Sequence, residues 1–352
     1  MQKKSIDLLR SMDKSLRVTG IGSLPFIDEG EACDLVLKYC PDIPYVPQLT
    51  KRDPKENMFL QFAENMPCVI EDYKKKQVFY DEEADREKKM AEFYDYISYN
   101  CYEHFKIGPE YLRTFYPMLE KCSSKDNPFV KVQVTGPVTY LISLTKKDKQ
   151  SMIFDEEFTE AMTLGLAMKG LWQVQEIKKI GKIPILFFDE PSLWGLGSAY
   201  LAVSDERVSF LISSFIDFIR ERENGLIIGL HCCGNTNWRI VLELGIDILS
   251  FDSYSFGEKL ALYPEEVRNF LERGGFLSFG LVPTAEFKKG ITEDELYNRF
   301  LLVLEKFEKE GVSREDILKS IIYTPACGMG TMKEDESKQV FKLTESLARR
   351  VK

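Results

Sequence analysis

Short runs rich in β-branched and aromatic residues alternate along the chain with longer amphipathic stretches. The stretches, such as 208–222 and 293–309, repeat their apolar positions at helical spacing. The short runs are almost continuously apolar, which is typical of parallel strands buried on both faces. Each run ends in a cluster of Gly, Pro or polar residues, and we count eight, at 18–25, 43–48, 129–137, 183–191, 226–234, 246–252, 276–284 and 320–328.

Eight β/α units predict an α/β protein with a (β/α)8 TIM barrel, formed as a single domain over residues 1–352. An open, doubly wound sheet is the alternative architecture. The gap at 49–128 is much longer than a simple crossover, and it contains the charged run 71–90. We expect a helical insertion there with a solvated face, and a lid over the barrel mouth is the functional alternative.

Composition places the chain among ordinary globular proteins, with 352 residues, 44% apolar and 29% charged. Its net charge of −9 argues against binding to nucleic acid or to an anionic membrane surface. Residues 1–10 do not look like a secretory signal, and no apolar run approaches the ~18 residues of a membrane span. The eight cysteines form no repeated pattern, so we expect reduced thiols and a cytoplasmic protein.

Polar side chains with catalytic potential gather where the expected strands end. The carboxyl ends of the strands of a (β/α)8 barrel form its active face, so these side chains are expected to meet there. They are Ser23, Gln48, Thr135, Asp189, Glu190, His231, Cys233, Asp252, Thr284 and Cys327.

The sequence His231-Cys232-Cys233 is the sharpest of these signals. Alternate side chains of a strand share a face, so His231 and Cys233 point together and Cys232 points away. Cys327 ends the eighth run, and closure of a barrel would let it approach the other two. Two thiolates and an imidazole suit Zn²⁺ and leave one position open for a substrate. A buried histidine with two packing cysteines is the alternative reading.

Three other strand ends carry polar groups with a possible role in the site. Asp189 and Glu190 are adjacent and therefore face opposite ways, so one could hold an amine in the barrel mouth while the other bonds to backbone. The alternative is a capping role for this pair at the helix after Pro191. The segment Ile21-Gly22-Ser23 allows close backbone approach and could bind a carboxylate, unless it is only a strand-to-helix turn. Asp252 ends the sixth run and has a structural turn as its alternative.

These motifs together resemble the catalytic half of cobalamin-independent methionine synthase, in the superfamily that also contains uroporphyrinogen decarboxylase and corrinoid-dependent methyltransferases. The segment 47–58 resembles a compact single-barrel subgroup. The matching motifs keep the family's order along most of the chain, at 19–25, 133–138, 189–191, 231–233, 247–252 and 324–328.

The resemblance implies a zinc-dependent methyltransferase that acts on a thiol such as homocysteine. It places zinc on His231, Cys233 and Cys327, with Asp252 at the position of the family's glutamate ligand. It also places homocysteine contacts on Ile21, Gly22, Ser23 and Asp189, beside which we group Glu190 as a substrate-binding candidate.

The methyl donor expected from the sequence differs from that of the family. The family's proton-donating histidine has no counterpart at the end of the seventh run, which reads Gly-Leu-Val-Pro-Thr at 280–284, and the folate-binding half of the long synthase is not present. A methylated corrinoid, or a corrinoid protein, is therefore the expected donor. The alternatives are a uroporphyrinogen decarboxylase-like enzyme and a non-catalytic barrel that binds a thiol or a corrinoid.

Overall fold

The computed structural model describes residues 2–196 and 203–351 and contains one large, curled parallel sheet. Its six strands pair in chain order, and each coincides with one of the runs predicted from the sequence. They are β3 (Phe129–Thr135), β4 (Ile183–Asp189), β5 (Ile227–Cys232), β6 (Ile248–Phe251), β7 (Phe276–Val282) and β8 (Ile321–Pro325).

The first two predicted strands, 18–25 and 43–48, are not regular strands. They are extended segments held by isolated bridges, from Val18 to β8, from Ser23 to Gln48, and from Tyr45 to β3. Their proline and glycine content explains the difference, because Pro44 and Pro47 have no N–H to donate to a continuous ladder. The two segments nevertheless connect the edge strands β8 and β3, so the structure shows six of the eight predicted strands and a TIM-like arrangement.

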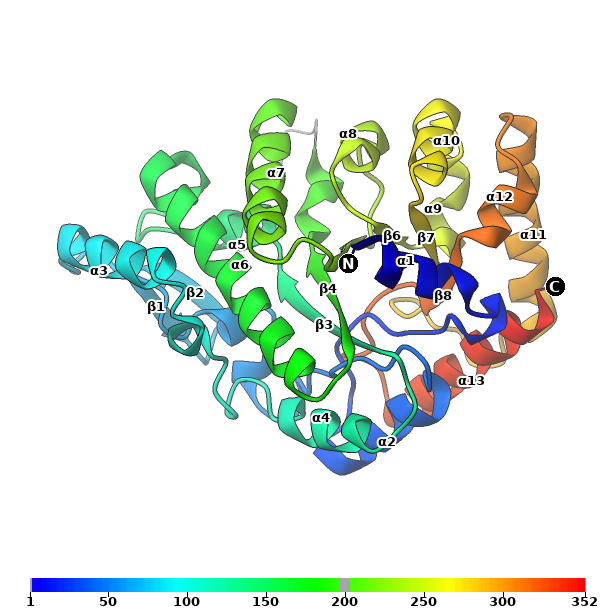
Figure 1. Cartoon of the computed structure of the whole chain (residues 1–352), viewed down its shortest axis with the longest axis horizontal. Coiled ribbons are helices and arrows are strands. Elements are labelled where there is room, and N and C mark those ends of the chain that lie inside the picture. Colours follow the sequence, from blue (N-terminus) through cyan, green and yellow to red (C-terminus); the bar gives the residue numbers. More distant parts are fainter. Residues whose placement is uncertain (1, 197–202, 352) are drawn as a thin grey trace.

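Helices flank the outside of the sheet (Figure 1). The helices predicted at 208–222 and 293–309 are confirmed as α7 (Asp205–Arg222) and α11 (Glu293–Lys309), and a Thr292/Glu295 capping box starts α11. The other helices outside the long insertion are α1 (Gln2–Ser11), α2 (Glu29–Tyr39), α5 (Pro137–Ser143), α6 (Glu156–Lys179), α8 (Trp238–Glu243), α9 (Ser253–Leu260), α10 (Pro264–Glu272), α12 (Arg314–Lys319) and α13 (Glu334–Arg350). Short 3₁₀ turns lie at Lys14–Leu16, Pro54–Glu56, Leu60–Phe62, Tyr102–Phe105, Met152–Phe154 and Pro191–Gly195.

Two apolar clusters hold the fold together. The larger packs the strands against the surrounding helices, whereas a smaller one collects side chains from all six strands near their amino ends. Leu9 of α1 closes the smaller cluster, which also contains Ile43, Phe129, Ile185, Phe187, Ile227, Ile248, Phe276 and Ile322. A shared inner layer of this kind is what a barrel-like curl of the sheet produces.

The insertion at 49–128 is only partly helical. It contains α3 (Arg86–Ser98) and α4 (Phe115–Ser123), as expected, but also a hairpin of β1 (Val69–Asp72) and β2 (Gln77–Tyr80). The charged run 71–90 therefore covers β2 and the turn of the hairpin before α3 begins, so the expectation of a helix over that whole run is wrong. The hairpin lies on the same side of the molecule as α3 (Figure 1).

No helix in the described part of the chain combines the length and apolar character needed to cross a membrane.

Candidate metal centre

A cavity of about 440 Å³ opens at the carboxyl ends of the strands. Seven of the ten polar residues predicted to meet there line it, whereas Thr135, Glu190 and Asp252 do not. The seven are Ser23, Gln48, Asp189, His231, Cys233, Thr284 and Cys327. The strand ends thus converge on one cavity, as the parallel arrangement requires.

Three of these side chains form a group that can hold a metal ion. The ligand atoms of His231, Cys233 and Cys327 all lie within 4.8 Å of one another. His231 lies on β5 in register with Asp189 of β4 and Ser250 of β6, and Cys327 follows β8. The structure therefore brings the sulfur atom of Cys327 close to His231 and Cys233, which lie almost a hundred residues earlier in the sequence.

The imidazole of His231 supports a metal as the partner of this group. Its Nδ1 atom lies 3.0 Å from the Ser250 hydroxyl, which fixes the ring, and the side chain is buried. Its Nε2 atom is also buried and makes no hydrogen bond of ordinary geometry among the described residues, although the ring lies close enough to Cys233 to lower the pKa of that thiol. Since an unsatisfied buried nitrogen is costly, a bound cation would supply what the protein does not. The pattern of one anchored and one free ring nitrogen is typical of metal-binding histidines.

The side chains of Cys233 and Cys327 interact through a hydrogen bond. A hydrogen bond from the Cys327 thiol, together with His231, lowers the pKa of Cys233 to about 4. The same interaction and burial raise the pKa of Cys327 well above its ordinary value. The interaction therefore favours the thiolate form on Cys233 rather than on Cys327. The neighbouring Cys232 is fully buried on the other face of β5, where burial raises its pKa.

Asp252 lies beside this group. Its carboxylate accepts a hydrogen bond of 2.9 Å from the Ser255 N–H and so caps the start of α9. Burial raises its pKa, with a further contribution from the nearby Cys233. The cap is the structural role anticipated as its alternative, and ligation of metal by Asp252 stays a prediction.

The adjacent residues Asp189 and Glu190 do face different ways. Asp189 lines the cavity, and its buried Oδ1 atom has no hydrogen-bond partner among the described residues. Burial raises the pKa of Asp189, opposed by His231 and Lys131. Glu190 is fully buried elsewhere, where it accepts hydrogen bonds from the N–H groups of Val138 and Thr139 at the start of α5. Burial raises the pKa of Glu190 to about 7.

The segment Ile21-Gly22-Ser23 forms one wall of the cavity, where Ile21 and Ser23 are exposed to it. A Cβ atom on Gly22 would lie 2.8 Å from the amide ends of Gln48 and Gln133, so a larger residue here would have to displace these two side chains. The Ser23 hydroxyl accepts a hydrogen bond from the N–H of Gly330, which ties this wall to the loop after β8.

Sequence reasoning missed several residues around the cavity. Lys131 is buried inside the sheet and donates a 2.6 Å hydrogen bond to the Ile21 carbonyl, and burial lowers its pKa to about 8. The sequence could have indicated this residue, because Lys131 and Gln133 are two polar residues at alternate positions of an otherwise apolar run. Asn57, Met58 and Lys76 of the insertion also line the cavity. Asn57 and Met58 lie in the segment singled out by its resemblance, whereas nothing in the sequence pointed to Lys76.

The geometry therefore defines a class: a TIM-like α/β protein with a His/Cys/Cys group at the carboxyl end of its sheet. No protein-family model and no curated protein sequence matches the chain. Two solved structures are similar to it in fold. One is a B12-independent methionine synthase from Shewanella sp. W3-18-1 in complex with selenomethionine, with a TM-score of 0.54 and 14% identity over 96% of this chain and 97% of that one.

The other is the putative vitamin-B12 independent methionine synthase from Listeria monocytogenes, with a TM-score of 0.55 and 15% identity over 92% of this chain and 86% of that one. At this identity the likeness shows the fold alone. It agrees with the family resemblance seen in the motifs, and the chemistry is argued from the site.

Proposed function

We propose that this protein is a zinc-dependent methyltransferase that transfers a methyl group to the sulfur of a small thiol such as homocysteine. The observation that carries the proposal is the buried, unpartnered Nε2 of His231, which lies within 4.8 Å of two cysteine sulfur atoms in a cavity. Three ligands of this kind suit a catalytic zinc site that keeps one position for the substrate.

The donor set and the cavity assign roles to the chain's own residues. Zinc bound to His231, Cys233 and Cys327 would lower the pKa of a thiol that enters the open position, which makes its sulfur nucleophilic at neutral pH. Asp189 can accept hydrogen bonds from the amino group of the substrate, because its Oδ1 atom is buried and no donor within the described part of the chain reaches it. The 21–23 segment offers its backbone and the Ser23 hydroxyl to the carboxylate.

The residues at the end of β7 bear on the identity of the methyl donor. In the proposed reaction the substrate sulfur attacks the methyl carbon, so that an S–CH3 bond forms while the bond between the methyl group and the donor breaks, and the donor keeps that electron pair. The end of β7 offers Thr284 and apolar neighbours to the cavity but no histidine to protonate a leaving group. A methylated corrinoid needs no such proton, so we propose it, free or protein-bound, as the donor, with the insertion closing over it as a lid.

We also propose that the fold is a complete barrel and that the protein acts in the cytoplasm. The extended segments at 18–23 and 44–48 would complete the sheet as a distorted (β/α)8 barrel over the single domain 1–352. All eight cysteines are free thiols. The ligand thiols must stay reduced to bind zinc, which fits the cytoplasm.

Metal content and methyl transfer test this proposal together. We expect about one zinc per chain in the purified protein and transfer from methylcobalamin to homocysteine among a panel of thiols. Cys233→Ser and Cys327→Ser should lose the metal and slow transfer at least ~100-fold, since each removes a soft ligand. Cys232→Ser is the matched control and should keep both, because that side chain lies on the other face of β5.

Two results would contradict the proposal. One is the absence of stoichiometric zinc in the wild-type protein, and the other is transfer at the parental rate by the Cys233→Ser variant. Zinc binding without turnover of any thiol would instead favour the non-catalytic thiol-binding or corrinoid-binding barrel.

A further inference from the structure

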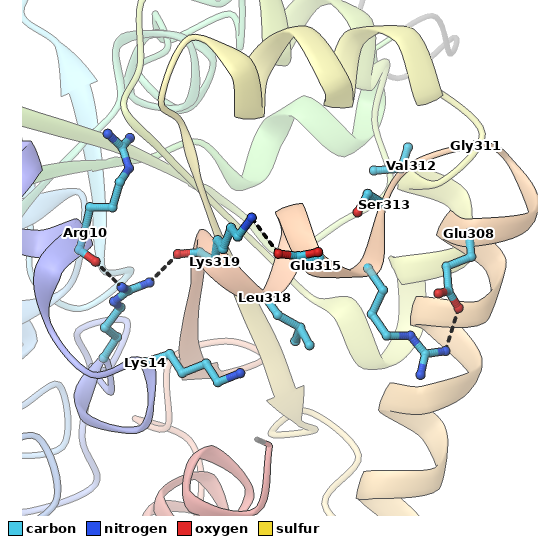
Figure 2. Close-up of a pocket in the computed structure, with 11 residues that line it drawn as sticks. Arg10, Lys14, Glu308, Gly311, Val312, Ser313, Glu315, Leu318 and Lys319 are labelled. Carbon is cyan, nitrogen blue, oxygen red and sulfur yellow. Dashed lines mark hydrogen bonds and ion pairs between the residues drawn. The ribbon is translucent and has the colours of Figure 1, made fainter.

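A second, larger hollow of about 990 Å³ lies at the opposite end of the sheet, between α1, α12 and the start of β8 (Figure 2). Lys319 lies two residues before β8, whereas Cys327 of the metal centre lies two residues after it. At ~3.3 Å per residue, the two sites are roughly 25 Å apart along this strand. The basic side chains that line the hollow are those of Arg10, Lys14, Arg17, Arg314 and Lys319.

The carboxylates of this hollow do not neutralise its positive charge. Only Glu308 and Glu315 line it, and each already pairs with one cation, Glu308 with Arg314 at 2.6 Å and Glu315 with Lys319 at 2.7 Å (Figure 2). The ammonium group of Lys14 has no hydrogen bond or ion pair within residues 2–196 and 203–351.

Arg10 and Arg17 are held mainly by neutral groups. Arg17 donates hydrogen bonds to the carbonyls of Arg10, Met12 and Lys319, and Arg10 donates one to the carbonyl of Gly274. Arg10 also faces Asp7 at 3.6 Å, but both of these side chains are exposed to solvent. Carbonyl groups satisfy N–H donors without cancelling a full charge, so the positive potential remains.

Arg17 is the residue that most strongly indicates an anion-binding site. The residue is 3% exposed, and its Nε is buried without a hydrogen-bond partner among the described residues. Burial lowers its pKa, with a contribution from Arg10, whereas Tyr323 and the exposed Asp13 act in the opposite direction. A buried guanidinium that keeps a donor without an acceptor among the described residues, beside a second cation, favours the binding of a further anion.

We propose that this hollow binds the phosphate group of a small phosphorylated molecule. Arginine forks match phosphate oxygens, and Lys14 adds a mobile point charge at the rim. The hollow is larger than inorganic phosphate needs and lies in the range of small-molecule sites. The net charge of −9 disfavours a long polyanion as the occupant, because the rest of the surface would repel it.

Calorimetric titration of the full chain with pyrophosphate, and separately with inorganic phosphate, tests this site at a constant ionic strength set by chloride. We expect saturable binding in the wild-type protein, with pyrophosphate tighter than phosphate. Lys14→Gln should raise the Kd about tenfold, because it removes a positive charge that makes no ion pair with any described residue. Arg17 is left unchanged in the test, since its hydrogen bonds hold α1 and the segment before β8.

Lys259→Gln, at an exposed position of α9, is the matched control and should keep the wild-type Kd. Equal binding by the Lys14→Gln and wild-type proteins would overturn the proposal, as would the absence of saturable binding up to ~10 mM of either anion. The measurement reads binding rather than methyl transfer, so its outcome is independent of the function proposed for the metal centre.

Discussion

At the scale of single residues, Asp252 has two candidate roles, as the N-cap of α9 and as a metal ligand. Its carboxylate caps α9 through the Ser255 N–H, yet it lies close enough to Cys233 and His231 for their charges to act on its pKa. A cap oxygen that already accepts a backbone hydrogen bond is a weaker metal ligand. The Ser255 hydroxyl also interacts with this carboxylate, and the cap and metal ligation differ in what a substitution would remove.

We predict that Asp252→Ala lowers the free energy of unfolding by about 1 kcal/mol, the usual cost of losing an N-cap, and keeps the zinc. Chemical denaturation and metal analysis of the purified variant measure the two effects. Asp28→Ala is the matched control, because Asp28 caps α2 in the same way through the Glu31 N–H. Loss of zinc from the Asp252 variant alone would assign Asp252 as the fourth ligand.

Strand periodicity explains which site residues the sequence could reveal. A period of two is enough to place His231 and Cys233 on one face, Cys232 on the other, and Asp189 and Glu190 on opposite sides. Periodicity gives no information about partners on neighbouring strands. Ser250, which anchors the His231 ring, depends on the register between β5 and β6 and could only be seen in the structure.

At the scale of secondary structure elements, the hairpin β1–β2 is the part of the insertion with a clear link to the cavity. Its turn carries Lys74, Lys75 and Lys76, and Lys75 pairs with Asp72 inside the hairpin. Lys76 has a φ of +55° and is the only one of the three that lines the cavity. Lys76 is also the only lysine or arginine among the lining residues, so it is suited to the phosphate of a corrinoid donor.

We predict that Lys76→Gln raises the KM for methylcobalamin about fivefold and leaves the KM for homocysteine unchanged, because the side chain lies at the rim rather than beside Asp189. A fivefold change corresponds to about 1 kcal/mol, within the range of a charged hydrogen bond. Steady-state kinetics of the zinc-loaded enzyme measure both constants. Lys74→Gln, on the same turn but outside the cavity, is the control, and identical kinetics of the two variants would exclude this role.

The elements that the sequence did not reveal share a physical cause. The six confirmed strands are predominantly apolar runs, whereas the segment at 43–48 is interrupted by both Pro44 and Pro47. The hairpin was not predicted, because the charged residues Glu71, Asp72 and the lysines of its turn are also typical of a solvated helix face. Pairing partners such as Thr145, which bridges to Phe79, are outside any local pattern.

At the scale of the whole molecule, a few hydrogen bonds and some buried polar groups link the edge strands β8 and β3 to the extended segments at 18–23 and 44–48. Thr19 bonds to Tyr323 of β8, and Val46 bonds to Lys131 of β3. Two fully enclosed lysines add to these links. Lys131 donates to the Ile21 carbonyl inside the sheet, and Lys169 of α6 donates to the Glu64 carbonyl in the insertion at 2.6 Å.

Enclosing these lysines makes the stability of the molecule depend on pH. Burial lowers the pKa of Lys169 to about 8 from an ordinary 10.5, with Glu64 and Glu71 opposing the shift. Between these two values the unfolded chain holds the proton and the folded chain does not. The free energy of unfolding therefore rises with pH in this window, because the cost of the buried charge disappears as the folded group loses its proton.

We predict that Lys169→Met loses this dependence. One pKa unit is worth about 1.4 kcal/mol, so the wild-type protein should gain on the order of 2 kcal/mol relative to the variant between pH 7 and pH 9.5. Comparison of the two proteins removes the contributions of other groups that titrate in the same range, such as buried thiols. Urea denaturation at several pH values measures the difference, and Lys259→Met on the surface of α9 should follow the wild-type curve. Parallel curves for the wild-type and Lys169→Met proteins would mean that Lys169 keeps its proton when folded, as it would if water reached the contact between α6 and the insertion.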